Sequence, residues 1–170
     1  MKWLLVAGAV MVGLIVLTTV WGALLPRGHH AQRSARFAQP PGAVWSVIAD
    51  PLGAASWRPD VRSVEPVPAP DGRLRWRELG SDAITYELLA DEPPRRRVVR
   101  IADDDLPFGG TWTYALAADG DGTRLTITED GEVRNPLFRF LARYVFGHGG
   151  TLEAYLRALG GRFGEEVSVS

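Results

Sequence analysis

The sequence predicts an α+β domain in which an antiparallel sheet of about seven strands is covered by one long helix near the C-terminus. Two observations predict this architecture. Between residues 71 and 133, turn signals rich in Gly, Asp and Pro recur at hairpin spacing, and the segments between them alternate apolar with polar side chains. Beyond residue 135, apolar residues recur every three or four positions, which is the period of an amphipathic helix.

Composition excludes several classes of function. The chain has 170 residues, a formal net charge of −1 and no cysteine. The nearly neutral charge gives no electrostatic reason to expect nucleic acid as a partner, and the lack of cysteine excludes disulfides, thiol nucleophiles and thiolate metal sites. No metal or cofactor is expected. About 145 residues follow an apolar N-terminal segment, which is enough for one domain with its own core.

The N-terminal segment from Trp3 to Leu25 carries no charge and is long enough to span a hydrocarbon core of about 30 Å. A cleavable signal peptide is the alternative, because Gly22 offers a weak cleavage site. Length, together with a tryptophan near each end (Trp3 and Trp21), favours a retained anchor. The expected organisation is a transmembrane anchor or uncleaved signal over residues 1–26, a ligand-binding domain over 27–165 and a tail over 166–170.

Basic residues around this segment favour one orientation. Lys2 precedes it, and three arginines follow it: Arg27, Arg33 and Arg36. By the positive-inside rule, this difference slightly favours a cytoplasmic domain. His29 and His30 lie in the same basic stretch, where adjacent residues of an extended chain point to opposite faces and no third ligand is near. We therefore expect solvated side chains beside the membrane rather than a metal site.

The first part of the domain is expected to contain a strand, two short helices and a second strand. In order, these elements are expected over residues 31–38, 43–49, 52–56 and 61–67. Pro40-Pro41-Gly42 ends the first strand, and Trp57-Arg58-Pro59-Asp60 is a second break.

Five further strands form a predicted meander. They are expected over residues 73–79, 83–90, 95–102, 111–118 and 123–133. The last hairpin is expected to pair Ala118 with Thr123, Leu116 with Leu125, Tyr114 with Ile127 and Trp112 with Glu129. An earlier hairpin is expected to pair Ala90 with Arg95, Tyr86 with Val99 and Ile84 with Ile101. Each register gathers apolar side chains on one face, while the other face carries solvated polar residues such as Glu87. The apolar face needs a cover.

The C-terminal helix is expected to supply this cover. Asn135-Pro136 begins it, because an Asn side chain caps free N–H groups and proline lacks an N–H that is not needed there. Its apolar stripe consists of Leu152, Tyr155, Leu156, Leu159 and Phe163. Three glycines interrupt the helix at 147–150, and each costs about 1 kcal/mol relative to Ala. A break is therefore expected there, between segments 137–146 and 152–163.

Short motifs occur in a fixed order along the chain. They are Pro41-x-x-Val44-Trp45-x-x-Ile48-x-Asp50, Trp57-x-Pro59-x-Val61, Trp76-x-Glu78, Phe108-Gly109-Gly110-Thr111-Trp112, Gly122-Thr123-x-Leu125-x-Ile127-x-Glu129, Asn135-Pro136 and Tyr155-Leu156-x-x-Leu159. With the order of elements, they resemble the helix-grip fold of the START-related (SRPBCC) superfamily, and within it the polyketide cyclase/dehydrase-like branch. The resemblance covers about residues 31–165. Members include lipid carriers, ligand binders, cyclases and chaperone cofactors, so it implies a fold more than an activity.

The resemblance implies a cavity between the concave face of the sheet and the long helix. Its expected wall residues are Trp76, Tyr86, Trp112, Tyr114, Phe138 and Tyr155, and ordinary core packing is the alternative. Glu78 and Glu129 share the inward alternation, and a carboxylate on an apolar face is suited to acid–base chemistry. Arg97 falls on the same inward alternation and is a candidate ion-pair partner for these carboxylates. Solvated positions at strand ends are the alternative for both carboxylates, and His148 is expected to be a surface hinge residue rather than a catalyst.

The loop over residues 103–110 has an apolar tip beside three aspartates. In proteins that this sequence resembles, the equivalent loop often forms a flap, so Leu106 and Phe108 are the expected gate. The aspartates argue against docking on an anionic membrane surface, and consecutive residues make a poor calcium cage.

The sequence therefore predicts a membrane-anchored domain that binds or transports a hydrophobic small molecule or lipid, with membrane contact through residues 3–25. A polyketide cyclase/dehydratase-like enzyme that uses an inward carboxylate is the alternative. A third hypothesis is a structural or stress-related interaction domain with a closed core.

Overall fold

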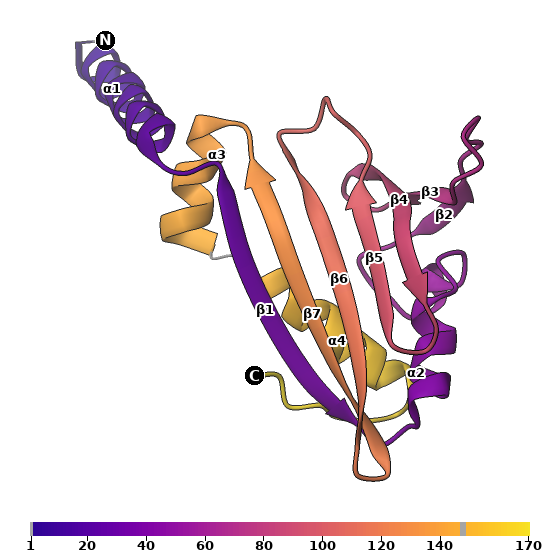
Figure 1. Cartoon of the computed structure of the whole chain (residues 1–170). Helices are drawn as coiled ribbons and strands as arrows, with labels where there is room; N and C mark the ends of the chain where they lie inside the picture. The colour runs from indigo at the N-terminus through magenta and orange to yellow at the C-terminus, as the bar shows by residue number, and fades with distance from the viewer. Residues whose placement is uncertain (1, 147–148) are drawn as a thin grey trace.

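The computed structural model describes residues 2–146 and 149–170. Within these residues, seven strands form one antiparallel sheet in the order β1-β7-β6-β5-β4-β3-β2. The strands are β1 (Gly28–Phe37), β2 (Ser63–Pro66), β3 (Arg75–Leu79), β4 (Ala83–Glu92), β5 (Arg96–Ile101), β6 (Phe108–Asp119) and β7 (Gly122–Val133). The meander follows chain order, and β1 pairs with β7 at its far edge (Figure 1).

Helices cover one face of this sheet. α2 (Pro41–Ile48) and the short helix η1 (Ala54–Ser56) connect β1 to β2, and α4 (Gly150–Arg162) crosses the concave face (Figure 1). The side chains of Leu152, Leu156 and Leu159 on α4 are fully buried against Leu125 and Ile127 of β7 and other core residues. This arrangement confirms the predicted α+β helix-grip fold.

The C-terminal helix is divided. α3 (Pro136–Leu141) and a short π-helix, η2 (Ala142–Phe146), come first, and α4 begins at Gly150. The Asn135 side chain accepts hydrogen bonds from the N–H groups of Leu137 and Phe138, as predicted. Of the break expected at 147–150, residues 147 and 148 lie outside the described residues. α3 lies beside the end of α1 (Lys2–Leu24), away from the part of the sheet that α4 covers (Figure 1).

The two predicted hairpin registers had different outcomes. The β6–β7 hairpin has every predicted pair, so that register is confirmed. The predicted β4–β5 register is wrong: Tyr86 lies opposite Ile101 instead of Val99, a shift of two residues. An irregularity between Leu88 and Ala90 changes the pairing along β4. Up to Leu88 the shift is two residues, so the same side chains stay on the apolar face and alternation cannot distinguish the two registers. From Ala90, which lies opposite Val98 instead of Arg95, the shift is three residues.

Two strands begin earlier than predicted. β1 includes His29 and His30, so these residues belong to the sheet rather than to a solvated stretch before it. β6 begins at Phe108, which shortens the expected loop. The C-terminal tail also joins the sheet, because Ser170 and Ser34 exchange two backbone hydrogen bonds at the free edge of β1.

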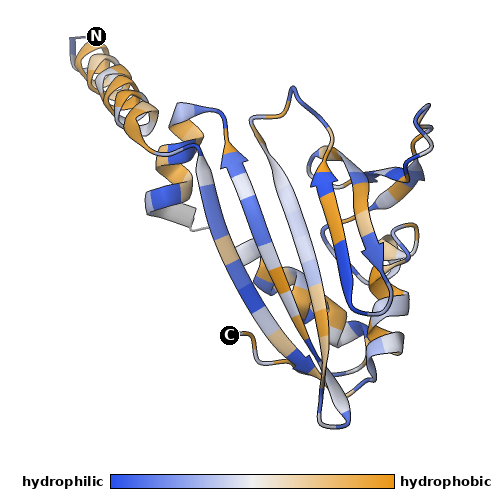
Figure 2. Cartoon of the chain, in the orientation of Figure 1, coloured by the Kyte–Doolittle hydropathy of each residue, from blue (hydrophilic) through white to orange (hydrophobic). Residues whose placement is uncertain are grey.

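α1 stands apart from the core. It is hydrophobic along almost its whole length (Figure 2). Its most apolar window has a mean hydropathy of 2.4 and none of that window is buried, unlike a core helix of a soluble protein. By length and composition, α1 is able to cross a membrane, and a signal sequence passes the same test.

Candidate functional site

A cavity of about 440 Å³ lies between the sheet and α4. Strands β1 and β3–β7, the segment around η1 and the start of α4 all contribute to its lining. Its lining includes the exposed residues Asp60 and Asp82 and the half-buried residues Phe108 and Glu132. Its volume falls within the range of about 300–1,000 Å³ that is usual for small-molecule sites.

Five of the six predicted wall residues line this cavity: Trp76, Tyr86, Trp112, Tyr114 and Tyr155. The rings of Trp76 and Tyr86 stack with centroids 5.8 Å apart, and Tyr155 packs edge-on against Trp112 at 6.0 Å. Phe138 lies outside the lining, on α3, and is 48% exposed. The prediction for Phe138 assumed that the first segment of the divided helix lies over the sheet as the second does, whereas α3 packs beside α1.

The two predicted gate residues have different positions. Phe108 lines the cavity as the first residue of β6. Leu106 is half-buried outside the lining, and its carbonyl accepts a hydrogen bond of 3.0 Å from Arg134 Nη1. The same Arg134 nitrogen donates to the carbonyl of Asp104, so one side chain ties the loop to the residues just before α3. A gating role for Phe108 stays a prediction.

Glu78 lines the cavity, and both of its carboxylate oxygens are occupied. Oε2 accepts a 2.8 Å hydrogen bond from Arg58 Nη1, and Oε1 accepts a 3.2 Å bond from Trp76 Nε1. The partner is therefore Arg58 and not the predicted Arg97. Sequence reasoning missed Arg58 as a site residue, although it lies between Trp57 and Pro59 in a motif that supported the family resemblance.

Arg58 is a permanent cation in the wall. Its guanidinium also binds Asp60 at 2.6 Å and lies 5.4 Å from the ring centre of Tyr155. Burial alone would lower the pKa of Arg58, but the hydrogen bond to Asp60 and the charge of Glu78 raise it above the ordinary value. The Arg58 charge is thus already balanced by two carboxylates.

Arg97 also lines the cavity but is less fully paired. Its Nη1 donates to Asp91 at 3.2 Å, and its guanidinium lies 5.9 Å from the ring centre of Trp76. Its Nη2 is buried and has no hydrogen-bond partner among the described residues. A buried donor without an acceptor is unfavourable, which makes Arg97 Nη2 the candidate donor to an oxygen atom of a ligand.

The cavity tyrosines are neutral. Burial raises the pKa of Tyr155 to about 12 and also raises the pKa values of Tyr86 and Tyr114. Their hydroxyl groups therefore keep their protons at physiological pH and add polar groups to an otherwise aromatic wall.

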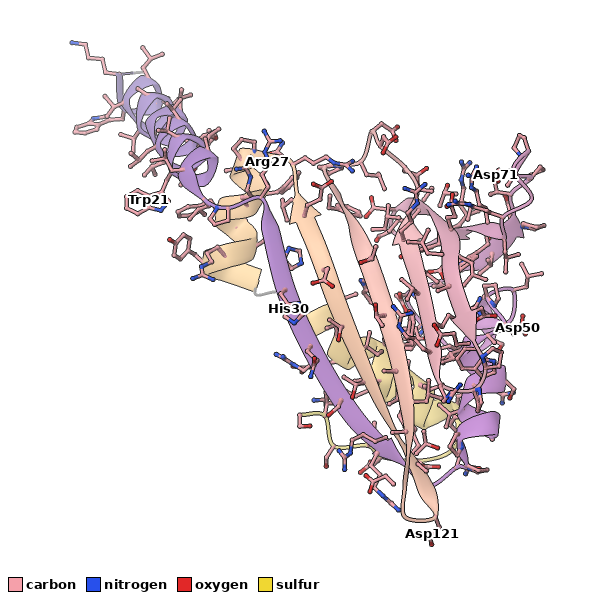
Figure 3. The ribbon with its side chains drawn as sticks, viewed as in Figure 1. Trp21, Arg27, His30, Asp50, Asp71 and Asp121 are labelled. Carbon is pink, nitrogen blue, oxygen red and sulfur yellow. The ribbon has the colours of Figure 1, made fainter. Side chains whose placement is uncertain are left out.

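Glu129 lines the same cavity together with His29. His29 Nε2 lies 3.5 Å from Glu129 Oε1, and both side chains are mostly buried. Burial lowers the pKa of His29, so its ring is neutral at pH 7. His30 points to the opposite face and contacts Asp130 at 2.8 Å (Figure 3). His29 lies two positions before Ala31, which is buried, so strand alternation places both side chains on the inner face of β1.

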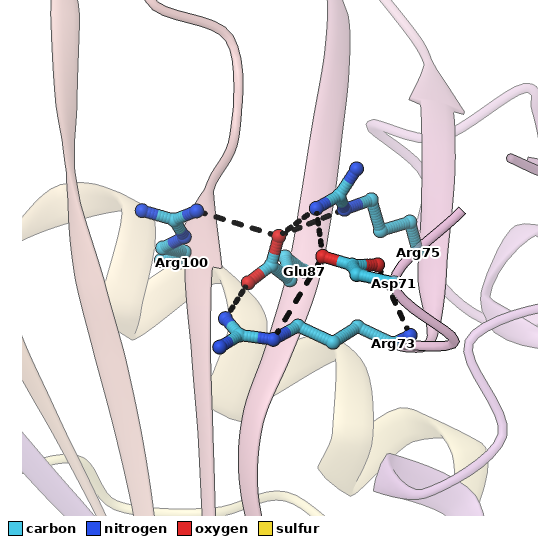
Figure 4. Close-up of polar contacts among 5 residues, drawn as sticks. All are labelled: Asp71, Arg73, Arg75, Glu87 and Arg100. Carbon is cyan, nitrogen blue, oxygen red and sulfur yellow. Dashed lines mark hydrogen bonds and ion pairs between the residues drawn. The ribbon is translucent and has the colours of Figure 1, made fainter. Parts of the chain in front are cut away.

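A second ionic cluster lies outside the cavity (Figure 4). Glu87 was predicted to be solvated, yet it is 0% exposed because three guanidinium groups enclose its carboxylate. They belong to Arg73, Arg75 and Arg100. The hydrogen bond from Arg73, opposed by burial and assisted by the other two arginines, lowers the pKa of Glu87 to about 2. Over residues 2–146 and 149–170, no three His, Asp or Glu side chains form a group suited to a metal.

Residues 28–163 match the family described as polyketide cyclase / dehydrase and lipid transport. The chain belongs to this family. The match covers the sheet, α2, α3 and α4, and it leaves α1 outside. No curated protein matched the chain.

Several solved structures have a similar fold. The Zhui aromatase/cyclase from Streptomyces sp. R1128 is 21% identical with a TM-score of 0.61, over 79% of this chain and 93% of that one. A START superfamily protein from Mycobacterium smegmatis has the same identity and TM-score, over 79% and 96%. A protein from Thermus thermophilus is 24% identical with a TM-score of 0.63, over 79% and 95%. Identities this low support the fold alone.

Proposed function

We propose that this protein is a membrane-anchored domain that binds a hydrophobic small molecule or lipid bearing a carbonyl, carboxylate or hydroxyl oxygen. The observation that carries the proposal is the buried Arg97 Nη2, which lacks an acceptor among the described residues in the wall of an aromatic cavity. A ligand oxygen would satisfy that donor, and the ligand's apolar body would lie against Trp76 and Tyr86. The Arg58–Glu78 pair is already satisfied and shapes the wall.

The proposed membrane anchor is α1. The apolar side chains of α1 are largely exposed and do not pack on the described core, and a bilayer would cover them. Three arginines (Arg27, Arg33 and Arg36) follow α1 and only Lys2 precedes it, which favours a cytoplasmic position for the domain.

The first experiment asks whether the cavity holds a molecule. The full chain would be purified in detergent and extracted with organic solvent, and the extract analysed by mass spectrometry. Ile84→Trp fills the cavity from β4, whereas Leu89→Trp adds the same ring at an exposed position of that strand. We expect one apolar compound to accompany the wild type and Leu89→Trp but not Ile84→Trp. The same compounds in all three extracts, or none in the wild type, would contradict binding in the cavity.

The second experiment tests the oxygen contact. Arg97→Met keeps an unbranched apolar stem but removes the guanidinium donor, and Arg96→Met is the matched control at the exposed neighbouring position. A hydrogen bond to a charged donor is worth about 1.5–3 kcal/mol, so affinity for the extracted compound should fall about 10- to 100-fold in Arg97→Met. Equal affinities in the two variants would exclude an oxygen contact at Arg97.

A second candidate function is acid–base chemistry on the bound molecule, which the His29–Glu129 pair favours. Neutral His29 is able to accept a proton, and Glu129 would stabilise the charged ring. In that case His29→Asn and Glu129→Gln should retain the unconverted compound, whereas the wild type and His30→Asn should also contain its product. Identical extracts from all four proteins would favour binding without chemistry.

A further inference from the structure

The α3–η2 segment (residues 136–146) is attached to α1 by specific contacts. A Cβ atom at Gly22 would collide with the carbonyl of Pro136, so the two helices are in direct backbone contact. Trp21 Nε1 donates a 3.3 Å hydrogen bond to the Tyr144 hydroxyl. Arg139 Nη1 donates at 3.0 Å to the carbonyl just after α1, at Leu25. The segment is therefore fixed to the last turn of the proposed membrane anchor.

Aromatic side chains face outward at this junction. Phe138 is 48% exposed, Tyr144 is 55% exposed and Trp21 is 54% exposed. The ring of Tyr144 packs at 5.0 Å on that of Phe140. Aromatic residues gather in this way where a membrane helix leaves the hydrocarbon core, because their rings suit the headgroup region. Trp21 and Arg27 lie at the end of the molecule opposite to Asp121 (Figure 3).

We propose that the α3–η2 segment lies on the surface of the bilayer, against the exit of α1, and that the end of the cavity lined by His29 and Glu132 faces the lipid. This inference rests on the proposed function, since it assumes that α1 crosses the membrane. The occupant of the exposed aromatic face is the lipid surface itself, because this face is continuous with the apolar surface of α1.

One end of the cavity lining is formed by residues of β1, β6 and β7. It consists of His29, Phe108, Gly109, Glu129 and Glu132. His29 follows Leu24 by five positions, so the two Cα atoms are at most about 18 Å apart even in a fully extended chain. On the other side, only two residues separate the end of β7 from the start of α3. This end of the lining therefore lies near the proposed membrane surface, whereas Asp60 belongs to the other edge of the sheet.

Charge does not account for this docking surface. Arg27 and Arg143 are exposed, but the exposed Asp104 and Asp105 lie in the loop that Arg134 ties to the start of α3. The mixed signs give little attraction to anionic lipid. The contact should therefore depend on apolar insertion and persist in neutral lipid and at high salt.

The experiment measures the depth of single labels in vesicles. The chain has no cysteine, so each single-cysteine variant carries one nitroxide label. The full chain would be reconstituted in phosphatidylcholine vesicles with the label at Phe138→Cys, Val10→Cys or Leu89→Cys. Paramagnetic resonance then compares collisions with oxygen, which concentrates in the bilayer, and with a water-soluble nickel chelate. Tyr144→Cys provides a second position on the segment, and circular dichroism verifies the fold of each variant.

We expect the Phe138 and Tyr144 labels to collide several-fold more with oxygen relative to nickel than the Leu89 label does, and to lie shallower than Val10. Two failures are distinguishable. If the Val10 label lies in the bilayer while the Phe138 and Tyr144 labels behave like Leu89, the anchor stands and the docking inference is wrong. If the Val10 label is also in water, the anchor itself is wrong. Loss of the Phe138 and Tyr144 signals at high salt would overturn insertion in favour of charge.

Discussion

Glu78 and Glu87 are buried carboxylates on adjacent strands, and both bind arginine, but they lie on different sides of the sheet. Glu87 is enclosed on the outer face by three guanidinium groups. Glu78 lies in the cavity wall and shares Arg58 with Asp60. Burial and ion pairing alone therefore do not separate a structural carboxylate from one beside a ligand.

The partners separate them. The carboxylate oxygens of Glu87 are covered by long side chains that hold the outer face of β3, β4 and β5 together (Figure 4). The partners of Glu78 are themselves parts of the cavity wall, because Arg58 and Trp76 both line it. We infer that Glu87 acts on stability and Glu78 on the shape of the binding site.

The largest expected effect on stability is that of Glu87→Ala. It leaves three guanidinium groups close together without their common anion. Surface pairs are worth about 0.2–1 kcal/mol and broken buried pairs cost about 3–5 kcal/mol, so at this enclosed surface position we expect a loss of about 2 kcal/mol. Urea unfolding measures it, with Glu92→Ala as control because Glu92 forms one exposed pair with Arg96. Equal losses in both variants would show that enclosure adds nothing.

Acid should reproduce part of this loss. The folded-state pKa of Glu87 is about 2, below the ordinary 4.5. The stability that this group contributes is therefore complete above about pH 4.5 and is lost as the pH falls toward 2. The effect should be smaller than that of Glu87→Ala, because a protonated carboxyl still accepts hydrogen bonds. Melting temperatures of wild type and Glu87→Gln should converge over this interval, and a constant difference would contradict the assignment.

The fold could be predicted because its signals are periodic. Alternation located the five strands of the meander, the breaks at proline bounded the two earlier strands, and the β6–β7 register followed from matching apolar faces. The β4–β5 register failed because the two-residue shift up to Leu88 leaves the apolar face unchanged, and because the irregularity between Leu88 and Ala90 has no signal in the alternation. The predicted packing of α3 on the sheet was also wrong, since an apolar stripe shows that a short helix packs on something but not on which neighbouring element. Contact with α1 depends on Gly22, which is one small residue in an apolar run.

The site was less predictable. The alternation along each strand identified Glu78, Glu129 and most aromatic wall residues, since successive strand side chains point to opposite faces. Arg58 comes from a loop, where no periodicity indicates direction. Glu87 has the parity of a solvated residue, and its enclosure results from arginines on three strands or loops that meet only in the folded chain.

Glu78→Gln is expected to lower stability less than Glu87→Ala and to alter the cavity more. Glutamine keeps the shape, and Arg58 retains Asp60 as a partner. The free energy of unfolding should fall by about 1 kcal/mol, the value of one net hydrogen bond. Retention of the extracted compound should nevertheless change, because the Arg58 guanidinium becomes available to it. If stability falls as far as in Glu87→Ala while retention is unchanged, the proposed difference between the two carboxylates is wrong.

The smallest expected effect concerns His29. Burial holds the folded-state pKa of His29 below 6.5, although the charge of Asp130 opposes this. Above pH 6.5 the ring is neutral in both states, so it adds no pH dependence there. As the pH falls below 6.5, the unfolded chain takes up a proton that the folded chain resists, and stability declines by a few tenths of a kcal/mol or more. His29→Asn should remove this decline, while His30→Asn, on the opposite face, should leave it in place. The same slope in all three proteins would mean that His29 is not shielded from water, and its proposed role beside Glu129 in the cavity would lose its physical basis.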